Sequence, residues 1–142
     1  MTSALNAQRS QYNRDAILSA TPIRLLTMLY DRLMLDLDRA ARAHEGQDWP
    51  VFSENLLHAQ DIVSELMSSL RVELWDGGEG LLAIYVYVSK ALIAANVGRD
   101  AAPLHESIAL LEPLRQTWHE AAAQLPARLA PLAPAGGMLG VA

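Results

Sequence analysis

The chain has 142 residues, 51% of them hydrophobic, no cysteine and a formal net charge of −5. This length suits one compact domain with a real core, and the lack of cysteine excludes disulfides and thiolate chemistry. Both signs of charge are interspersed without a dense basic stripe, which argues against a nucleic-acid partner. Many Ala and Leu residues at helical spacing predict an all-α fold, an antiparallel four-helix bundle over residues 21–125.

Residues 1–20 form a leader without a sustained helical stripe, in which Tyr12, Ile17 and Leu18 stand out as apolar anchors. The leader lacks a basic region followed by an apolar stretch, so we expect no secretory signal. The longest apolar run, residues 81–88, is too short to span a bilayer, and we expect no membrane insertion. Two interpretations of the leader stay open, a frayed terminus and a lid that covers apolar surface on the bundle.

The first helix is predicted from Pro22 to about His44, with Thr21 as N-cap and Gly46 near its C-terminal end. Its core stripe is Leu26, Leu29, Leu33, Leu37 and Ala40, widened by Ile23, Tyr30, Met34 and Ala41. Arg24, Thr27, Asp31, Asp38 and Arg42 are expected on the other side. Met28 and Leu35 fall among these polar residues, either as ordinary surface hydrophobics or as a contact face for another subunit or partner.

Asp48 is predicted to cap a second helix, with Pro50 in its first turn. Polar residues such as Glu54, His58 and Asp61 mark its outer face, and residues 76–80 are predicted as a turn. The turn has three glycines, but no strand precedes it and no phosphate-binding Gly-Lys-Ser/Thr follows it. The predicted core stripe is Phe52, Leu56, Ala59, Ile62, Val63, Leu66, Met67, Leu70 and Leu74.

The third helix is predicted from about Leu81 to Val97 and is apolar nearly all round. Its core stripe is Leu81, Ile84, Tyr85, Val88, Leu92 and Ala95, and a second apolar strip is formed by Leu82, Val86, Ile93 and Val97. Tyr87 lies beside that strip. Because no helix of a four-helix bundle is fully enclosed, part of this surface is expected to stay open and to bind a partner.

The fourth helix begins between Asp100 and Pro103 and is predicted to continue, kinked, through Pro113. Trp118 is expected in its core stripe, which consists of Leu104, Ile108, Leu111, Leu114, Trp118, Ala122 and Leu125. Residues 126–142 are rich in Pro, Ala and Gly with one charge, and are predicted to be a disordered tail.

The sequence predicts no catalytic residue, cofactor or metal. The Glu-x-x-His motif of di-metal bundles is absent, because Glu54 and His58 are four apart. His58 could instead accept a phosphoryl group, but Asp61 would repel it. We therefore weigh a phosphotransfer or metal-binding bundle as a minor alternative to a protein that binds partners.

Taken together, the segments resemble the flagellin-specific export chaperone family, FliS. The resemblance covers about residues 12–120. It departs from the family pattern at Val86, Lys90-Ala91 and Pro113. The residues that carry it are Tyr12, Ile17-Leu18, Ala20-Thr21-Pro22, Leu26, Met28-Leu29-Tyr30-Asp31, Ala59-Gln60-Asp61-Ile62, Glu65-Leu66, Ser68-Ser69-Leu70, Tyr85, Tyr87, Leu92, Ala95-Asn96, Leu114-Arg115 and Thr117-Trp118.

The resemblance implies a cytoplasmic chaperone, not an enzyme, that binds the disordered C-terminal segment of flagellin. It would prevent premature polymerisation and deliver flagellin to a component of the flagellar export gate. The chaperone could form a homodimer when free, and a self-associating structural bundle remains the main alternative function. The residues predicted to bind partners are Tyr12, Ile17, Leu18, Met28, Leu35, Leu82, Val86, Tyr87, Ile93 and Val97.

Overall fold

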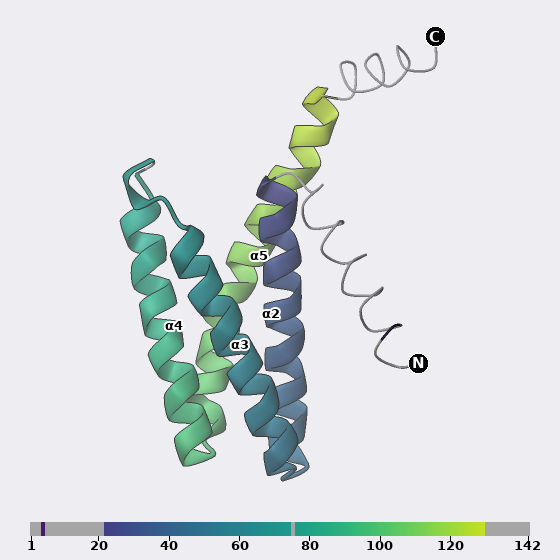
Figure 1. The fold of residues 1–142 in the computed structure, drawn as a ribbon, viewed down its shortest axis with the longest axis vertical. Helices are drawn as coiled ribbons and strands as arrows, with labels where there is room; N and C mark the ends of the chain where they lie inside the picture. The colour runs from purple at the N-terminus through teal and green to yellow at the C-terminus, as the bar shows by residue number, and fades with distance from the viewer. Residues whose placement is uncertain (1–3, 5–21, 75, 130–142) are drawn as a thin grey trace.

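The computed structural model describes residues 4, 22–74 and 76–129, and its four long helices run alternately up and down (Figure 1). They are α2 (Pro22–Glu45), α3 (Trp49–Ser69), α4 (Gly78–Gly98) and α5 (Ala101–Leu129), with a short 3₁₀ turn η1 (Val72–Leu74) before α4. The predicted antiparallel four-helix bundle is confirmed. The Thr21 cap and the leader lie outside the described residues, apart from Ala4.

Each helix packs against two neighbours, and this order decides which surfaces face one another. Both α2 and α4 pack against α3 and α5, whereas α2 and α4 share few contacts. They therefore lie diagonally across the bundle, and their outer faces point away from each other. An apolar strip on α2 and one on α4 cannot merge into a single flat surface.

The core lies between the four helices and follows the predicted stripes closely. Tyr30, Phe52, Tyr85 and Trp118 supply its aromatic part, the first three almost fully buried and Trp118 half-buried against them. One assignment on α2 was wrong, because Thr27 is buried and not on the polar side. Its hydroxyl donates to the Arg24 carbonyl of its own helix at 2.7 Å, so burial leaves no unpaired polar group.

α3 ends earlier than the apolar pattern predicts. The hydroxyls of Ser68 and Ser69 donate to the carbonyls of Ser64 and Leu66 at 3.0 and 3.2 Å, and such bonds compete with helix continuation. Leu70 then takes an extended conformation. The prediction that Leu74 belongs to the core is wrong, because Leu74 lies in η1 with 70% of its surface exposed.

α4 begins at Gly78, three residues before the predicted start, so part of the expected glycine turn is helical. Gly78 is buried where the helix start passes close to η1. A Cβ atom at this position would lie 2.6 Å from the carbonyl oxygen of Val72 and 2.8 Å from its Cα. Only glycine allows this approach of two backbones.

Gly78→Ala is therefore expected to lower the free energy of unfolding by about 1–3 kcal/mol, as overpacking does. Gly80→Ala is the matched control, because nothing lies within 4 Å of its added Cβ. An alanine in this helical position should stabilise by about 0.5–1 kcal/mol. Urea unfolding followed by circular dichroism measures both variants. Equal effects in the two would show that the contact with Val72 does not constrain α4.

α5 is one continuous helix through Pro113 and reaches Leu129, beyond the ends of the other helices (Figure 1). Pro113 has no N–H to donate to the Ala109 carbonyl. Ala109 is exposed, as expected. Asp100 begins the helix, since its carboxylate accepts the Ala102 amide at 3.0 Å. The predicted tail boundary was too early, because 126–129 are helical, while 130–142 lie outside the described residues.

The end of the bundle that holds the α2–α3 and α4–α5 turns is closed by an aromatic cluster. His44 Nε2 lies 2.8 Å from the Arg99 carbonyl oxygen and joins the two turns. The Arg99 guanidinium stacks 4.9 Å from the Trp49 ring, which packs edge-on against Phe52 at 5.7 Å. Such a cation–π contact favours one arrangement of the turns. The opposite end has no comparable closure among the described residues.

Candidate functional site

The most apolar open surface described is on α4. Its outer side presents Leu82, Val86, Ile93 and Val97, which we call the α4 strip. Leu82 is partly buried, and the other three are exposed by 39%, 48% and 83%. Glu79 and Lys90 are the charged residues beside them, and they line a shallow hollow with Leu82 and Val86. The predicted open strip on the third helix is therefore present as a surface.

α4 is long and apolar enough to cross a membrane by length and composition alone, with a mean hydropathy of 1.6 over an 18-residue stretch, and it is the one such helix in the part of the chain described. Its other side, however, supplies Leu81, Tyr85, Val88, Leu92 and Ala95 to the bundle core. The hydropathy of α4 thus has two sources, a buried stripe and the exposed α4 strip.

Tyr87 borders the α4 strip on the side of α5. Its hydroxyl donates to the Glu106 carboxylate of α5, and this hydrogen bond raises the pKa of the tyrosine. The ring remains half-exposed over a second hollow lined by Ala83 and Leu110. Tyr87 is thereby held toward α5 and widens the apolar surface of α4 in that direction.

Met28 and Leu35 are exposed on α2, by 41% and 40%, as predicted. Leu35 lines a groove between α2 and α5 with Met34 and Ile108. Because α2 and α4 are diagonal, these two residues and the α4 strip are separate surfaces.

Charged side chains join α2 to α5 along this groove. Arg115 donates to Asp31 at 3.1 Å and to both oxygens of Glu112 at 2.9 Å, and His119 Nε2 lies 2.7 Å from Asp31. The hydrogen bond to Arg115 lowers the pKa of Glu112, and the same bond raises the pKa of Arg115. These groups are at the surface, so they orient the helices more than they stabilise the fold.

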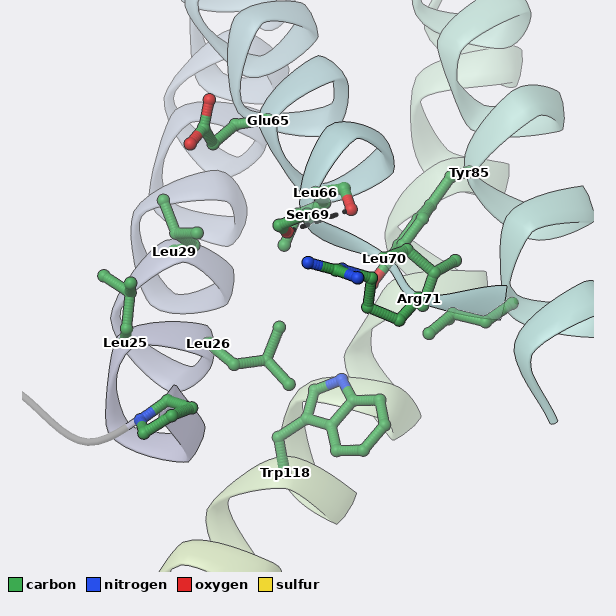
Figure 2. Close-up of a pocket in the computed structure, with 12 residues that line it drawn as sticks. Leu25, Leu26, Leu29, Glu65, Leu66, Ser69, Leu70, Arg71, Tyr85 and Trp118 are labelled. Carbon is green, nitrogen blue, oxygen red and sulfur yellow. Dashed lines mark hydrogen bonds between the residues drawn. The ribbon is translucent and has the colours of Figure 1, made fainter. Parts of the chain in front are cut away.

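A pocket of about 400 Å³ opens at the end of the bundle where α2 begins (Figure 2). We call it the end pocket. All four helices contribute to it, and most of its wall is apolar, with Glu65, Ser69 and Arg71 as the polar members. The apolar lining consists of Pro22, Leu25, Leu26, Leu29, Leu66, Leu70, Leu81, Tyr85 and Trp118.

The sequence did not predict this pocket, because its lining residues looked like ordinary core. Behind it, the hydroxyls of Tyr30 and Tyr85 lie 2.7 Å apart in the buried core, and Trp118 packs edge-on against Tyr30 at 6.3 Å. Burial raises the pKa of both tyrosines, so both hydroxyls stay neutral. The pocket therefore has a rigid, uncharged floor suited to an apolar anchor.

His58, predicted on the polar outer face of the second helix, contacts a neighbouring helix. Its Nδ1 bonds the carboxylate of Asp36, a fully buried residue of α2 that also accepts from Arg32 Nε at 3.1 Å. The bond between His58 and Asp36 connects α3 to α2. Because Asp36 also bonds Arg32, its carboxylate is paired, and a paired carboxylate is tolerated in the interior. Within the described ranges, no group of three or more His, Asp or Glu side chains could hold a metal. The predicted residues Tyr12, Ile17 and Leu18 lie outside those ranges.

Known proteins share both the fold and the sequence pattern. A crystal structure described as a flagellar chaperone from bacteria superposes with a TM-score of 0.67 at 17% identity, over 85% of this chain and 98% of that one. The fold is therefore that of a bacterial flagellar chaperone. The flagellar secretion chaperone FliS of Bacillus subtilis (strain 168) is 31% identical over 120 residues, covering 83% of this chain and 88% of that protein.

The corresponding Escherichia coli (strain K12) protein is 28% identical over 111 residues, 75% of this chain and 79% of its own. The family model described as Flagellar protein FliS matches residues 4–125. The chain belongs to the FliS family. Members of this family are chaperones and not enzymes, which agrees with the expectation from the sequence.

Proposed function

We propose that this chain is a cytoplasmic export chaperone for flagellin. It binds the disordered C-terminal segment of flagellin, prevents its premature polymerisation and delivers it to the flagellar export apparatus. Membership of the FliS family supports the flagellar client. The observation that carries the proposal is the α4 strip, an apolar surface with few charges that nothing in the described bundle covers.

The α4 strip suits an amphipathic helix or an extended apolar segment laid along it, a common mode of peptide recognition. Full burial of a Val, Leu or Ile side chain contributes about 1.5–3 kcal/mol. Three or four such side chains, each already part-covered, can offset the roughly 2–5 kcal/mol needed to order a disordered client. Binding would then be favourable without any catalytic or cofactor chemistry.

Calorimetric titration with a peptide of the flagellin C-terminal region tests the proposal. We expect one peptide to bind per chain, with a negative heat-capacity change from the burial of apolar surface. A peptide of scrambled sequence and equal composition is the control. Equal binding of both peptides would show non-specific apolar adhesion, and no binding of either would refute the flagellin client.

We further propose that the leader covers the end pocket until the client arrives. Pro22, the first residue of α2, lines this pocket. Ile17 and Leu18 precede it by five and four residues, a reach of at most about 18 Å. Leu81 and Tyr85 at the start of α4 also line this pocket, so a client that extends beyond the Leu82 end of the α4 strip would reach it. Marginal docking of the leader would permit exchange, because ordering the linking residues offsets much of its apolar burial.

Hydrogen exchange with and without saturating client peptide tests this lid. Residues 8–20 should become less protected on binding, whereas α4 becomes more protected. A leader that is equally unprotected in both states would contradict the lid. In that case Tyr12 would be left with another role, such as contact with the export gate.

A further inference from the structure

We infer that the end pocket binds the C-terminal end of the client chain, with the terminal carboxylate of the client on the guanidinium of Arg71. This site rests on the proposed function, in which the client is the C-terminal segment of flagellin. Apolar side chains at the end of the client fill the pocket, and the carboxylate stays at its mouth. The site thereby fixes which way the client runs along the bundle.

Arg71 is the one cationic residue among the described residues that line the end pocket. It follows Leu70, whose extended conformation ends α3, and its guanidinium points into the pocket toward α2 (Figure 2). Within the described part of the chain, this guanidinium has no hydrogen bond and no ion pair. A guanidinium presents its N–H donors as a planar fork that matches the two oxygens of a carboxylate. The end pocket therefore presents a positive charge that can pair with a carboxylate of a bound chain.

The other polar groups that line the pocket do not neutralise this charge. Glu65 is the one carboxylate among the same lining residues, and Figure 2 shows its oxygens directed away from Arg71. The hydroxyl of Ser69 donates to the carbonyl of Leu66 at 3.2 Å. The charge at the mouth of the pocket thus favours an anionic ligand over a cationic one.

The shape of the end pocket favours the end of a chain over a segment that passes through. Tyr30 and Tyr85 close its inner side, where their hydroxyls lie 2.7 Å apart in the buried core. A passing segment would have to enter and turn back, which buries peptide N–H and C=O groups against apolar walls without partners. A chain end buries apolar side chains and keeps its carboxylate at Arg71. The volume of about 400 Å³ lies within the roughly 300–1,000 Å³ typical of ligand sites.

The position of the pocket relative to the α4 strip sets the direction of the client. Leu81 of the pocket is adjacent in sequence to Leu82, the first residue of the strip, and Val97 is the last. A client that ends at Arg71 and also covers the α4 strip therefore has its earlier residues toward Val97. Its C-terminus lies beyond Leu82.

Calorimetric titration of the full chain with two forms of the flagellin C-terminal peptide tests this site. One form ends in a free carboxylate and the other in an amide, which removes the terminal charge. We expect the free acid to bind the unmodified chain about tenfold or more tightly, because hydrogen bonds to charged groups are the stronger ones. The net charge of −5 acts in the opposite direction, so such a preference indicates a local cation.

Arg71→Gln should bind the two forms with equal affinity, because it removes the cation and keeps a polar side chain. Arg71 is exposed, so this variant should fold, which circular dichroism checks. Arg42→Gln is the matched control. It removes the same charge from an exposed side chain of α2 that pairs with Asp38 at 3.0 Å and does not line the end pocket. The control should keep the preference for the free acid.

Equal binding of the acid and the amide by the unmodified chain would overturn the site and leave the flagellin client intact. A preference for the acid that persists in Arg71→Gln would overturn the assignment to Arg71. Loss of the preference in Arg42→Gln would indicate a long-range effect of charge and would contradict the site as well. Binding of neither peptide would refute the proposed function, and the site with it.

Discussion

Trp118→Ala is expected to lower the free energy of unfolding by about 3–5 kcal/mol, the range found when a core Trp is truncated. The indole is half-buried, packs edge-on against Tyr30 at 6.3 Å and belongs to the packing shell of the core. Its removal would enlarge the end pocket and detach this part of α5 from α2. Urea unfolding followed by circular dichroism measures the loss.

Trp118→Phe is the matched control, because it keeps an aromatic ring against Tyr30. We expect this variant to retain most of the stability. A loss near zero for Trp118→Ala would contradict the packing described for α5. It would mean that the ring contributes to the surface and not to the fold.

Val86→Lys combined with Ile93→Lys is expected to weaken binding of the flagellin peptide by an order of magnitude or more. Two lysines would replace apolar contacts and would have to be desolvated under the client. Both residues are substantially exposed in the free chain, so the free energy of unfolding should change little. Calorimetric titration and urea unfolding of the same preparation separate the two effects.

Val51→Lys provides the control, because Val51 of α3 is exposed by 38%, close to the 39% of Val86, and lies outside the α4 strip. It should bind peptide as the unmodified chain does. Leu35→Lys tests whether a long client also contacts α2. Weaker binding of the client by this variant would show that it does. Unchanged binding by the double variant would place the client elsewhere, and an unfolded double variant would show that the two residues belong to the core.

Most of the fold could be predicted from the sequence because helical periodicity records which side of each helix faces inward. Leu33, Leu56, Val88 and Leu111 were all predicted in the core and are fully buried. The exposed positions of Met28, Leu35, Val86 and Ile93 were predicted by the same pattern. Met28 and Leu35 lie off the core stripe of their helix, and Val86 and Ile93 belong to a second apolar strip beside a core stripe. Both patterns indicate exposure, because a bundle leaves one side of each helix uncovered.

The failures have local causes that periodicity does not record. Ser68 and Ser69 bond backbone carbonyls in the last turn of α3, where such bonds compete with helix continuation. Leu74 lies beyond this end and outside the core, although it fits the stripe. Gly78 starts α4 early because its missing Cβ admits the backbone of Val72. Both effects depend on single atoms and not on hydrophobic pattern.

The end pocket could not be predicted because it depends on how four helices meet. Leu26, Leu66 and Leu81 each lie on an inward-facing stripe, and each stripe is consistent with a filled core. Only the arrangement of the helices in space shows that their side chains leave about 400 Å³ open at one end. The bond between His58 and Asp36 was missed for the same reason, since 22 residues separate them in sequence.

The most direct test of the central claim is photo-crosslinking from the α4 strip. A photoreactive phenylalanine analogue is placed at position 93 in one variant and at position 51 in another, and each is irradiated with full-length flagellin. We expect crosslinks from position 93 to the C-terminal segment of flagellin and none from position 51. Equal crosslinking from both positions, or crosslinks from position 51 alone, would contradict the assignment of the client to α4.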